Sequence, residues 1–146
     1  MKLSTKSRYG LRILTDIAVS MANNNGASKG RDIAQRQNLT EAYLEQIMIP
    51  LKSSNLIRTQ RGCRGGYILN AEPADITVLD VIESFEGKIS FVDCLDTDEC
   101  TQFARCPTQD VWRELSRAFR AKAASITLQD IVDTYNEQNK NFDFII

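Results

Sequence analysis

Apolar side chains recur every three to four residues in three stretches of the first half of the chain, as they do on helix faces that pack on a core. The first stretch spans residues 9–21 and ends where Asn and Gly favour a left-handed helix end. Ser28 offers an N-cap for a short second helix, and Thr40 offers one for a third helix over residues 41–52. Pro50 lacks an amide donor, so we expect the last turn of the third helix to kink or to end early.

Two β-prone runs follow at residues 56–59 and 66–69, and a segment rich in glycine and arginine separates them. This pattern predicts a hairpin over residues 56–70. Two short helices joined by a tight break, followed by a hairpin with a basic tip, are typical of a winged helix-turn-helix DNA-binding domain in a mainly α protein. A plain three-helix unit with a structural hairpin is the alternative.

In this interpretation the third helix enters the major groove, and the residues outside its apolar stripe face the bases. Gln can bond adenine, Glu can accept from cytosine, and Ala can touch a thymine methyl. Arginines on a hairpin tip suit a narrow minor groove. The candidate DNA-contacting residues are Ser28, Thr40, Ala42, Tyr43, Glu45, Gln46, Arg58, Arg61 and Arg64.

The second half of the chain predicts further helices after a linker at residues 71–75. Nearly the same sequence stands at residues 76–84 and 126–134, and in both a Thr precedes an Asp by three positions, which suits a helix N-terminus. A long amphipathic helix from residue 109 to 124 has more apolar surface than its own domain needs, so we expect it to cross the same helix of a second copy. The expected division is 1–71 for the DNA-binding region, 72–136 for a cysteine loop with dimerisation helices, and 137–146 for a tail that is disordered or docked.

Charge divides the chain in the same place. Residues 1–70 carry eleven Lys and Arg against four Asp and Glu, whereas residues 71–146 carry seven against fifteen. A basic first half suits a phosphate backbone, so double-stranded DNA is the expected partner, although ordinary surface charge would also produce an imbalance. No apolar run is long enough to span a membrane, and nothing resembles a signal peptide, so we expect a cytoplasmic protein.

Three of the four cysteines fall within thirteen residues: Cys94, Cys100 and Cys106, with five residues between each pair. Cys63 stands alone on the hairpin tip and is interpreted as an exposed thiol. Three thiolates on one loop suit an iron–sulfur cluster best; a metal-free thiol switch is the next interpretation and a zinc site the last. A cluster takes four ligands and the chain has no histidine. The fourth could be a group from a second subunit, a small molecule, or one of Asp93, Asp96, Asp98, Glu99 and Gln109.

Several segments together resemble the Rrf2 family of bacterial winged-helix regulators: residues 1–12, 43–46 and 61–67. The cysteine spacing and residues 112–116 and 126–128 look most like its IscR branch. The resemblance implies a homodimer on a near-palindromic operator, with Glu45 and Gln46 reading bases and Arg61 in the minor groove. It also implies that Cys94, Cys100 and Cys106 hold a cluster, [2Fe–2S] in preference to [4Fe–4S].

Two features depart from the family's pattern: the fourth cluster ligand and the hairpin tip. The branch completes its ligand set with a histidine, and the matching position here is Gln109. The hairpin tip carries Cys63 and Arg64 where the family usually has Pro-Gly. In the NsrR branch an acidic residue near the partner's N-terminus can ligate, but position 8 here is Arg8.

The expected function is therefore a DNA-binding repressor or activator that senses iron–sulfur status and controls cluster-assembly genes. The alternative is a cluster-free regulator of sulfur or cysteine metabolism that responds to thiols or to a partner protein. An enzyme is not expected, because the chain has no histidine for proton transfer and no nucleotide-binding loop.

Overall fold

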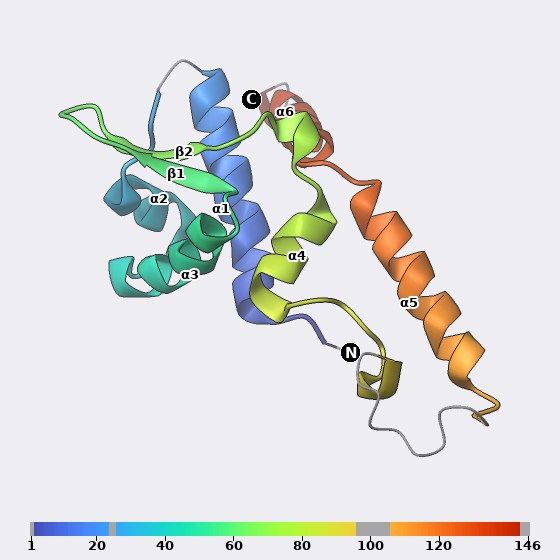
Figure 1. The fold of residues 1–146 in the computed structure, drawn as a ribbon. Coiled ribbons are helices and arrows are strands. Elements are labelled where there is room, and N and C mark those ends of the chain that lie inside the picture. Colours follow the sequence, from blue (N-terminus) through green and yellow to red (C-terminus); the bar gives the residue numbers. More distant parts are fainter. Residues whose placement is uncertain (1, 24–25, 96–105, 144–146) are drawn as a thin grey trace.

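The computed structural model describes residues 2–23, 26–95 and 106–143 and is mainly helical, with one antiparallel hairpin. Helix α1 runs through the middle of the molecule; α2, α3 and the hairpin lie on one side of it, and α4 and α6 on the other, with α5 beyond α4 (Figure 1). The elements are α1 Thr5–Ala22, α2 Gly30–Gln37, α3 Glu41–Ser53, β1 Ile57–Gln60, β2 Gly66–Leu69, α4 Val78–Glu86, α5 Gln109–Ala124 and α6 Leu128–Asp143, with short 3₁₀ turns η1 Pro73–Asp75 and η2 Asp93–Leu95.

The N-terminal helix begins four residues before the predicted start. Ser4 caps it by accepting a hydrogen bond from the amide of Ser7 at 3.2 Å, so the first turn is polar and lies outside the apolar stripe. The predicted N-cap of the second helix is wrong. The cap of α2 is Lys29, without a side-chain hydrogen bond, and the backbone of Ser28 is instead paired with Tyr67.

Helix α3 has its predicted cap and ends at Ser53, one residue past the predicted end at residue 52. Thr40 accepts a hydrogen bond from the amide of Tyr43 at 3.2 Å. The helix continues three residues past Pro50 to Ser53, so it does not end early, and the kink given as the other expected effect of Pro50 stays a prediction. Proline removes one donor only, and its own carbonyl still accepts from the Ser54 amide at 3.0 Å. Asn55, with φ of 57°, then ends the helix in the left-handed conformation.

The predicted hairpin is present, with Ile57 opposite Leu69 and Gln60 opposite Gly66. A third segment extends it, because the amide and carbonyl of Ser28 bond the carbonyl and amide of Tyr67 at 2.9 and 2.8 Å. A Cβ at Gly66 would lie 2.4 Å from the Ser28 carbonyl oxygen, so glycine is required for this approach. The hairpin is thereby tied to the segment that leads into α2.

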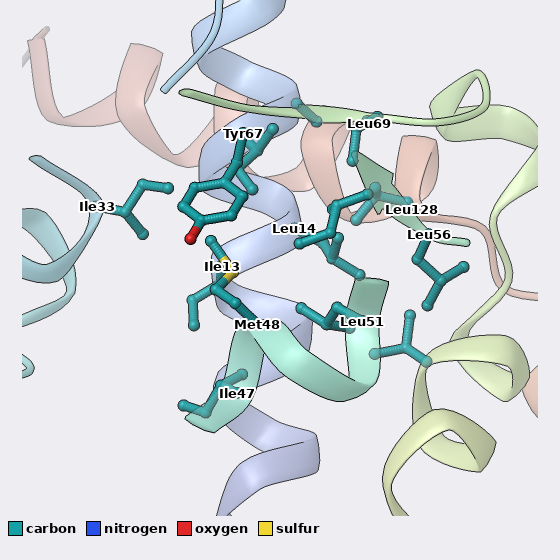
Figure 2. Close-up of a cluster of buried hydrophobic side chains, with 14 of the residues drawn as sticks. Ile13, Leu14, Ile33, Ile47, Met48, Leu51, Leu56, Tyr67, Leu69 and Leu128 are labelled. Carbon is teal, nitrogen blue, oxygen red and sulfur yellow. The ribbon is translucent and has the colours of Figure 1, made fainter. Parts of the chain in front are cut away.

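Apolar side chains from α1, α3 and the hairpin meet in one core (Figure 2). Burial of each large aliphatic side chain contributes about 1.5–3 kcal/mol relative to exposure, so this cluster holds α3 and the hairpin firmly on α1. Its fully buried members include Ile13, Leu14, Ile33, Ile47, Met48, Leu51 and Leu128.

The repeated sequence starts two helices in the same way, as predicted. Thr77 and Asp80 exchange side-chain and backbone hydrogen bonds at the start of α4, and Thr127 and Asp130 do so at the start of α6. The two threonines also pair across an antiparallel bridge with backbone hydrogen bonds of 2.9 and 2.8 Å. The two copies of the repeated sequence are therefore paired with each other through their backbones.

Helix α6 continues to Asp143, so the boundary expected at residue 136 does not coincide with the end of a helix. The end of the predicted tail, residues 144–146, lies outside the described part of the chain. Within that part, no helix combines the length and the hydrophobicity that crossing a bilayer would require.

Candidate nucleic-acid interface and cysteine segment

Helix α3 divides into a buried and an exposed face. Its apolar stripe of Leu44, Ile47, Met48 and Leu51 is at most 1 % exposed. Four of the predicted DNA-contacting residues are exposed on or just before the helix, and a fifth, Tyr43, is half-buried. The exposed four are Thr40, Ala42, Glu45 and Gln46. The helix thus presents hydrogen-bonding side chains to solvent on a rigid support.

Tyr43 is held against the N-terminal helix. Its ring stands edge-on to that of Tyr9, with centroids 6.0 Å apart, and the guanidinium of Arg12 lies 5.1 Å from the Tyr9 centroid. These contacts tie the exposed start of α3 to α1.

The hairpin carries the three predicted arginines at exposed positions: Arg58 on β1, and Arg61 and Arg64 in the turn. The Gly65 amide bonds the Gly62 carbonyl at 2.9 Å, and Gly62 has a φ of 113°, which favours glycine. Cys63 is exposed on the same tip, in line with its interpretation as a free surface thiol. The hairpin therefore carries three exposed cationic side chains, two of them in its turn.

Ser28 does not join this exposed set. Its side chain is only 4 % exposed, and its hydroxyl is buried with no hydrogen-bond partner in the described structure. The residue contributes through its backbone, by fixing the hairpin. We therefore leave it out of the proposed DNA contacts.

The structure adds a residue that sequence reasoning missed. The hydroxyl of Tyr67, on β2, donates a hydrogen bond to Oε1 of Glu45 on α3 at 3.0 Å. Burial, and then the hydrogen bond and charge of Glu45, raise the pKa of Tyr67 to about 12. Strand alternation places Tyr67 on the inward face of β2, but nothing in the sequence pairs it with a residue 22 positions earlier.

The cysteine segment is described at its two ends. Cys94 lies in the short turn η2 and Cys106 lies just before α5; both are free and partly exposed. Cys100 lies outside the described residues, so the convergence of the three thiols stays a prediction. Among the residues outside the 96–105 gap, no three Cys, Asp or Glu side chains are grouped closely enough to hold a metal ion.

The upstream side of this segment is anchored on two helices. The Ile89 amide bonds the carboxylate of Glu83 at 3.0 Å, and the Phe91 amide bonds the hydroxyl of Ser116 on α5 at 3.1 Å. The ring of Phe91 also meets that of Phe119 edge-on, with centroids 6.1 Å apart. The chain that leads to Cys94 is therefore positioned by α4 and α5 together.

Cys106 and Gln109 lie together at the start of α5. The Sγ of Cys106 is 3.4 Å from the hydroxyl oxygen of Thr108, and hydrogen bonding by Thr108 lowers the pKa of the Cys106 thiol. The side-chain amide nitrogen of Gln109 is buried without a partner among the residues described. Buried N–H groups normally have an acceptor, so this one has capacity to bind an added group.

Helix α5 presents an apolar surface to solvent. Val111 is 53 % exposed and Leu115 is 45 % exposed, on a different face from the buried Ser116 and Ala123. Both side chains are thus open to solvent in the single chain, and the predicted crossing of this helix with a second copy stays a prediction.

Comparison with known proteins agrees with this architecture. The family model Rrf2, described as an iron-dependent transcriptional regulator, matches residues 3–134. The HTH-type transcriptional regulator CymR of Bacillus subtilis is 36 % identical over 146 residues, the full length of both chains. The HTH-type transcriptional regulator IscR of Photorhabdus laumondii is 31 % identical over 133 residues, covering 91 % of this chain and 80 % of that protein.

Two solved structures have the same fold. That of B. subtilis CymR, called the global cysteine regulator of that organism, superposes with a TM-score of 0.74 over 92 % of this chain and 98 % of its own. That of T. potens IscR, 34 % identical, gives a TM-score of 0.74 over 94 % of this chain and 90 % of its own. The hairpin is thus the wing of a winged helix, and the chain belongs to the Rrf2 family of DNA-binding transcriptional regulators.

Proposed function

We propose that this regulator reads a near-palindromic operator with α3 and the wing, and that an iron–sulfur cluster on Cys94, Cys100 and Cys106 sets its DNA-binding state. Glu45 and Gln46 contact base edges in the major groove, Arg61 enters the minor groove, and Arg58 and Arg64 contact phosphates. Thr40, Ala42 and Tyr43 complete the contact at the start of α3. Two copies joined through α5 match the two half-sites.

The observation that carries the cluster proposal is the chemistry of the segment between η2 and α5. Cys94 and Cys106 are free thiols at its two ends, and a third cysteine lies between them. Thiolates are the ligands that iron–sulfur clusters prefer, and a lowered pKa at Cys106 favours the ligating form. The donor set therefore fits a cluster, with one position left for a ligand from outside the three cysteines.

Gln109 supports the same site. Its amide nitrogen, buried and without a partner among the described residues, lies three positions after Cys106 and can donate to a sulfur acceptor. Hydrogen bonds to sulfur tune the potential of such centres. When bound, a [2Fe–2S] group supplies a redox-active and labile centre whose presence reports iron–sulfur supply.

The protein's own contacts connect this segment with the DNA-binding unit. Glu83 on α4 binds both the Ile89 amide and Arg120 of α5. Three residues later, Glu86 accepts hydrogen bonds from the amide of Ser4 at 2.9 Å and from the hydroxyl of Ser7, at the start of α1. Helix α4 thus contacts the segment at one position and α1 at another, and α1 supports α3 through the core.

A second candidate is a cluster-free regulator of cysteine or sulfur metabolism. The full-length similarity to CymR, the global cysteine regulator of B. subtilis, favours it. In that case Cys94, Cys100 and Cys106 act as reduced or oxidised thiols. The two candidates share the DNA contacts and differ in iron content.

The experiment is anaerobic purification, with measurement of visible absorbance, iron and acid-labile sulfide, for the native chain and for a variant with Ala at Cys94, Cys100 and Cys106. Cys63→Ala is the matched control, because this exposed thiol lies on the wing. We expect a coloured native protein, an equally coloured Cys63→Ala variant and a colourless triple variant. A native protein that stays free of iron and sulfide after reconstitution would refute the cluster and leave the thiol regulator.

A further inference from the structure

Glu45 poses an electrostatic problem on a DNA-facing helix. Phosphates repel a free carboxylate. A carboxylate on this helix therefore favours DNA binding only if its oxygens accept hydrogen bonds from the DNA or from the protein. One of its two oxygens already has a partner in the free protein, the Tyr67 hydroxyl at 3.0 Å. The second oxygen stays available, because a carboxylate has several acceptor positions.

Tyr67, the donor of this hydrogen bond, is held in place by backbone and core contacts. The backbone of Tyr67 is bonded to Ser28 on one side and stands opposite Thr59 in the hairpin on the other. Its side chain is 9 % exposed and belongs to the core cluster, and Figure 2 shows its ring among the labelled core residues. The ammonium group of Lys52 lies 5.1 Å from the ring centroid.

A glycine leaves room beside the hydrogen bond between Tyr67 and Glu45. Gly30, the first residue of α2, would place a Cβ 3.4 Å from Cε2 of Tyr67 and 3.8 Å from Oε1 of Glu45. A larger side chain would reach over the hydrogen bond. A tyrosine hydroxyl is protonated in the neutral range, and the raised pKa of Tyr67 extends its role as a donor to higher pH.

We infer that Tyr67 is a positioning residue for operator recognition: by holding one carboxylate oxygen of Glu45, it orients the other towards a base-pair amino group in the major groove. The inference rests on the proposed function, in which α3 reads base edges. The base expected opposite Glu45 is cytosine, whose N4 amino group donates in the major groove. Wing and recognition helix are thereby coupled through one hydrogen bond.

The test begins by selecting duplexes from random-sequence DNA with the native protein, which defines an operator. Binding of the native protein and of Tyr67→Phe is then compared on this operator and on variants changed at one base pair at a time. Loss of one hydrogen bond corresponds to about a 2- to 13-fold change in a binding constant. We expect discrimination to fall by this factor at one base pair in each half-site and to stay within twofold elsewhere.

A double-mutant cycle separates positioning from a general structural role. Tyr67→Phe should have no further effect in a Glu45→Ala background, and Tyr135→Phe, which removes a hydroxyl from the exposed face of α6, should behave as native. A uniform loss of affinity over all sequences, or an effect that persists without Glu45, would overturn the inference. If the native protein selects no sequence, the proposed function itself fails.

A DNA-free readout covers the case in which Tyr67→Phe does not fold. Ultraviolet titration of the four tyrosines should place one well above the others in the native protein. In Glu45→Ala, the pKa of this tyrosine should fall, because a hydrogen bond and a nearby negative charge are both removed. An unchanged titration curve would show that the two side chains do not interact.

Discussion

The carboxylate of Glu83 on α4 binds the guanidinium of Arg120 on α5. The same carboxylate accepts the Ile89 amide, so one side chain joins the long helix to the segment that leads to Cys94. The two charged side chains are 26 % and 33 % exposed, so water screens the pair only in part. A carboxylate in this position can transmit a change in the cysteine segment to α4.

Replacement Glu83→Gln should therefore loosen the attachment of α5. We expect a loss of about 1 kcal/mol in the free energy of unfolding, measured by urea titration, because a charged pair is lost while a hydrogen-bonding side chain remains. Glu114→Gln is the control, since Glu114 lies 3.7 Å from Arg117 and both are more than 70 % exposed. Equal losses in the two variants would contradict a special role for Glu83.

Gly10 and Phe85 are in close contact where α1 crosses α4. A Cβ at Gly10 would lie 2.4 Å from Cε2 of Phe85, so the ring must shift to accept it. We expect Gly10→Ala to destabilise the protein by about 1–3 kcal/mol, despite the better helix propensity of alanine. In a Phe85→Leu background, Gly10→Ala should reduce the free energy of unfolding much less, because the ring that the new Cβ would meet is absent. A stabilising Gly10→Ala in the native background would refute the contact.

Acid should weaken the junction between α1 and α4. Hydrogen bonds, from the Ser4 and Ser7 side chains first, lower the pKa of Glu86. A carboxyl group whose folded pKa lies below its unfolded pKa stabilises the fold above the unfolded value, and this stabilisation disappears as pH falls through the folded value. The difference in unfolding free energy between native protein and Glu86→Gln should therefore be largest near neutrality and shrink below about pH 4. In a Ser7→Ala background, the difference in unfolding free energy between the proteins without and with Glu86→Gln should be smaller. A difference that does not change with pH would contradict a lowered pKa at Glu86.

The wing arginines should be visible in the salt dependence of DNA binding. Each phosphate contact contributes a slope of about −0.9 to log K against log salt concentration. Loss of Arg64 in Arg64→Ala should reduce the slope by about one for each protomer and weaken binding to all sequences alike. Arg61→Ala should also remove a preference for A·T pairs beside the half-site, because a narrow minor groove attracts arginine. Lys140→Ala, on α6, is the control and should leave both properties unchanged.

The exposed apolar face of α5 should control association. Leu115→Asp places a charge in the middle of the expected helix crossing, which is costly when the surface is buried. Sedimentation should show a shift from dimer to monomer, with a fall in operator affinity of more than tenfold, and Glu114→Gln should remain dimeric. A Leu115→Asp variant that sediments as the native protein does would place the dimer contact elsewhere.

Local sequence patterns are enough to predict the helices, the hairpin and the residues that could bind DNA or a cluster. Helical spacing around Leu44 to Leu51, the cap at Thr40 and the glycine-rich turn between β-prone runs predict the winged helix, because each depends on neighbouring residues. The Thr-Asp repeat predicts two helix starts for the same reason. The early helix end expected at Pro50 is wrong, since a proline in the last helical turn removes only one donor. The N-cap expected at Ser28 is wrong because this residue pairs with the hairpin through its backbone.

Contacts between residues that are distant in the sequence became known from the packing of the elements. Tyr67 and Glu45 lie 22 positions apart, Glu83 and Arg120 lie 37 apart, and Ser7 and Glu86 lie 79 apart. Such pairs depend on how helices cross and on which rotamers the packed core allows, and no local periodicity encodes either. The bridge between Thr77 and Thr127 has the same origin: each half predicts a capped helix, and only packing brings the two caps together.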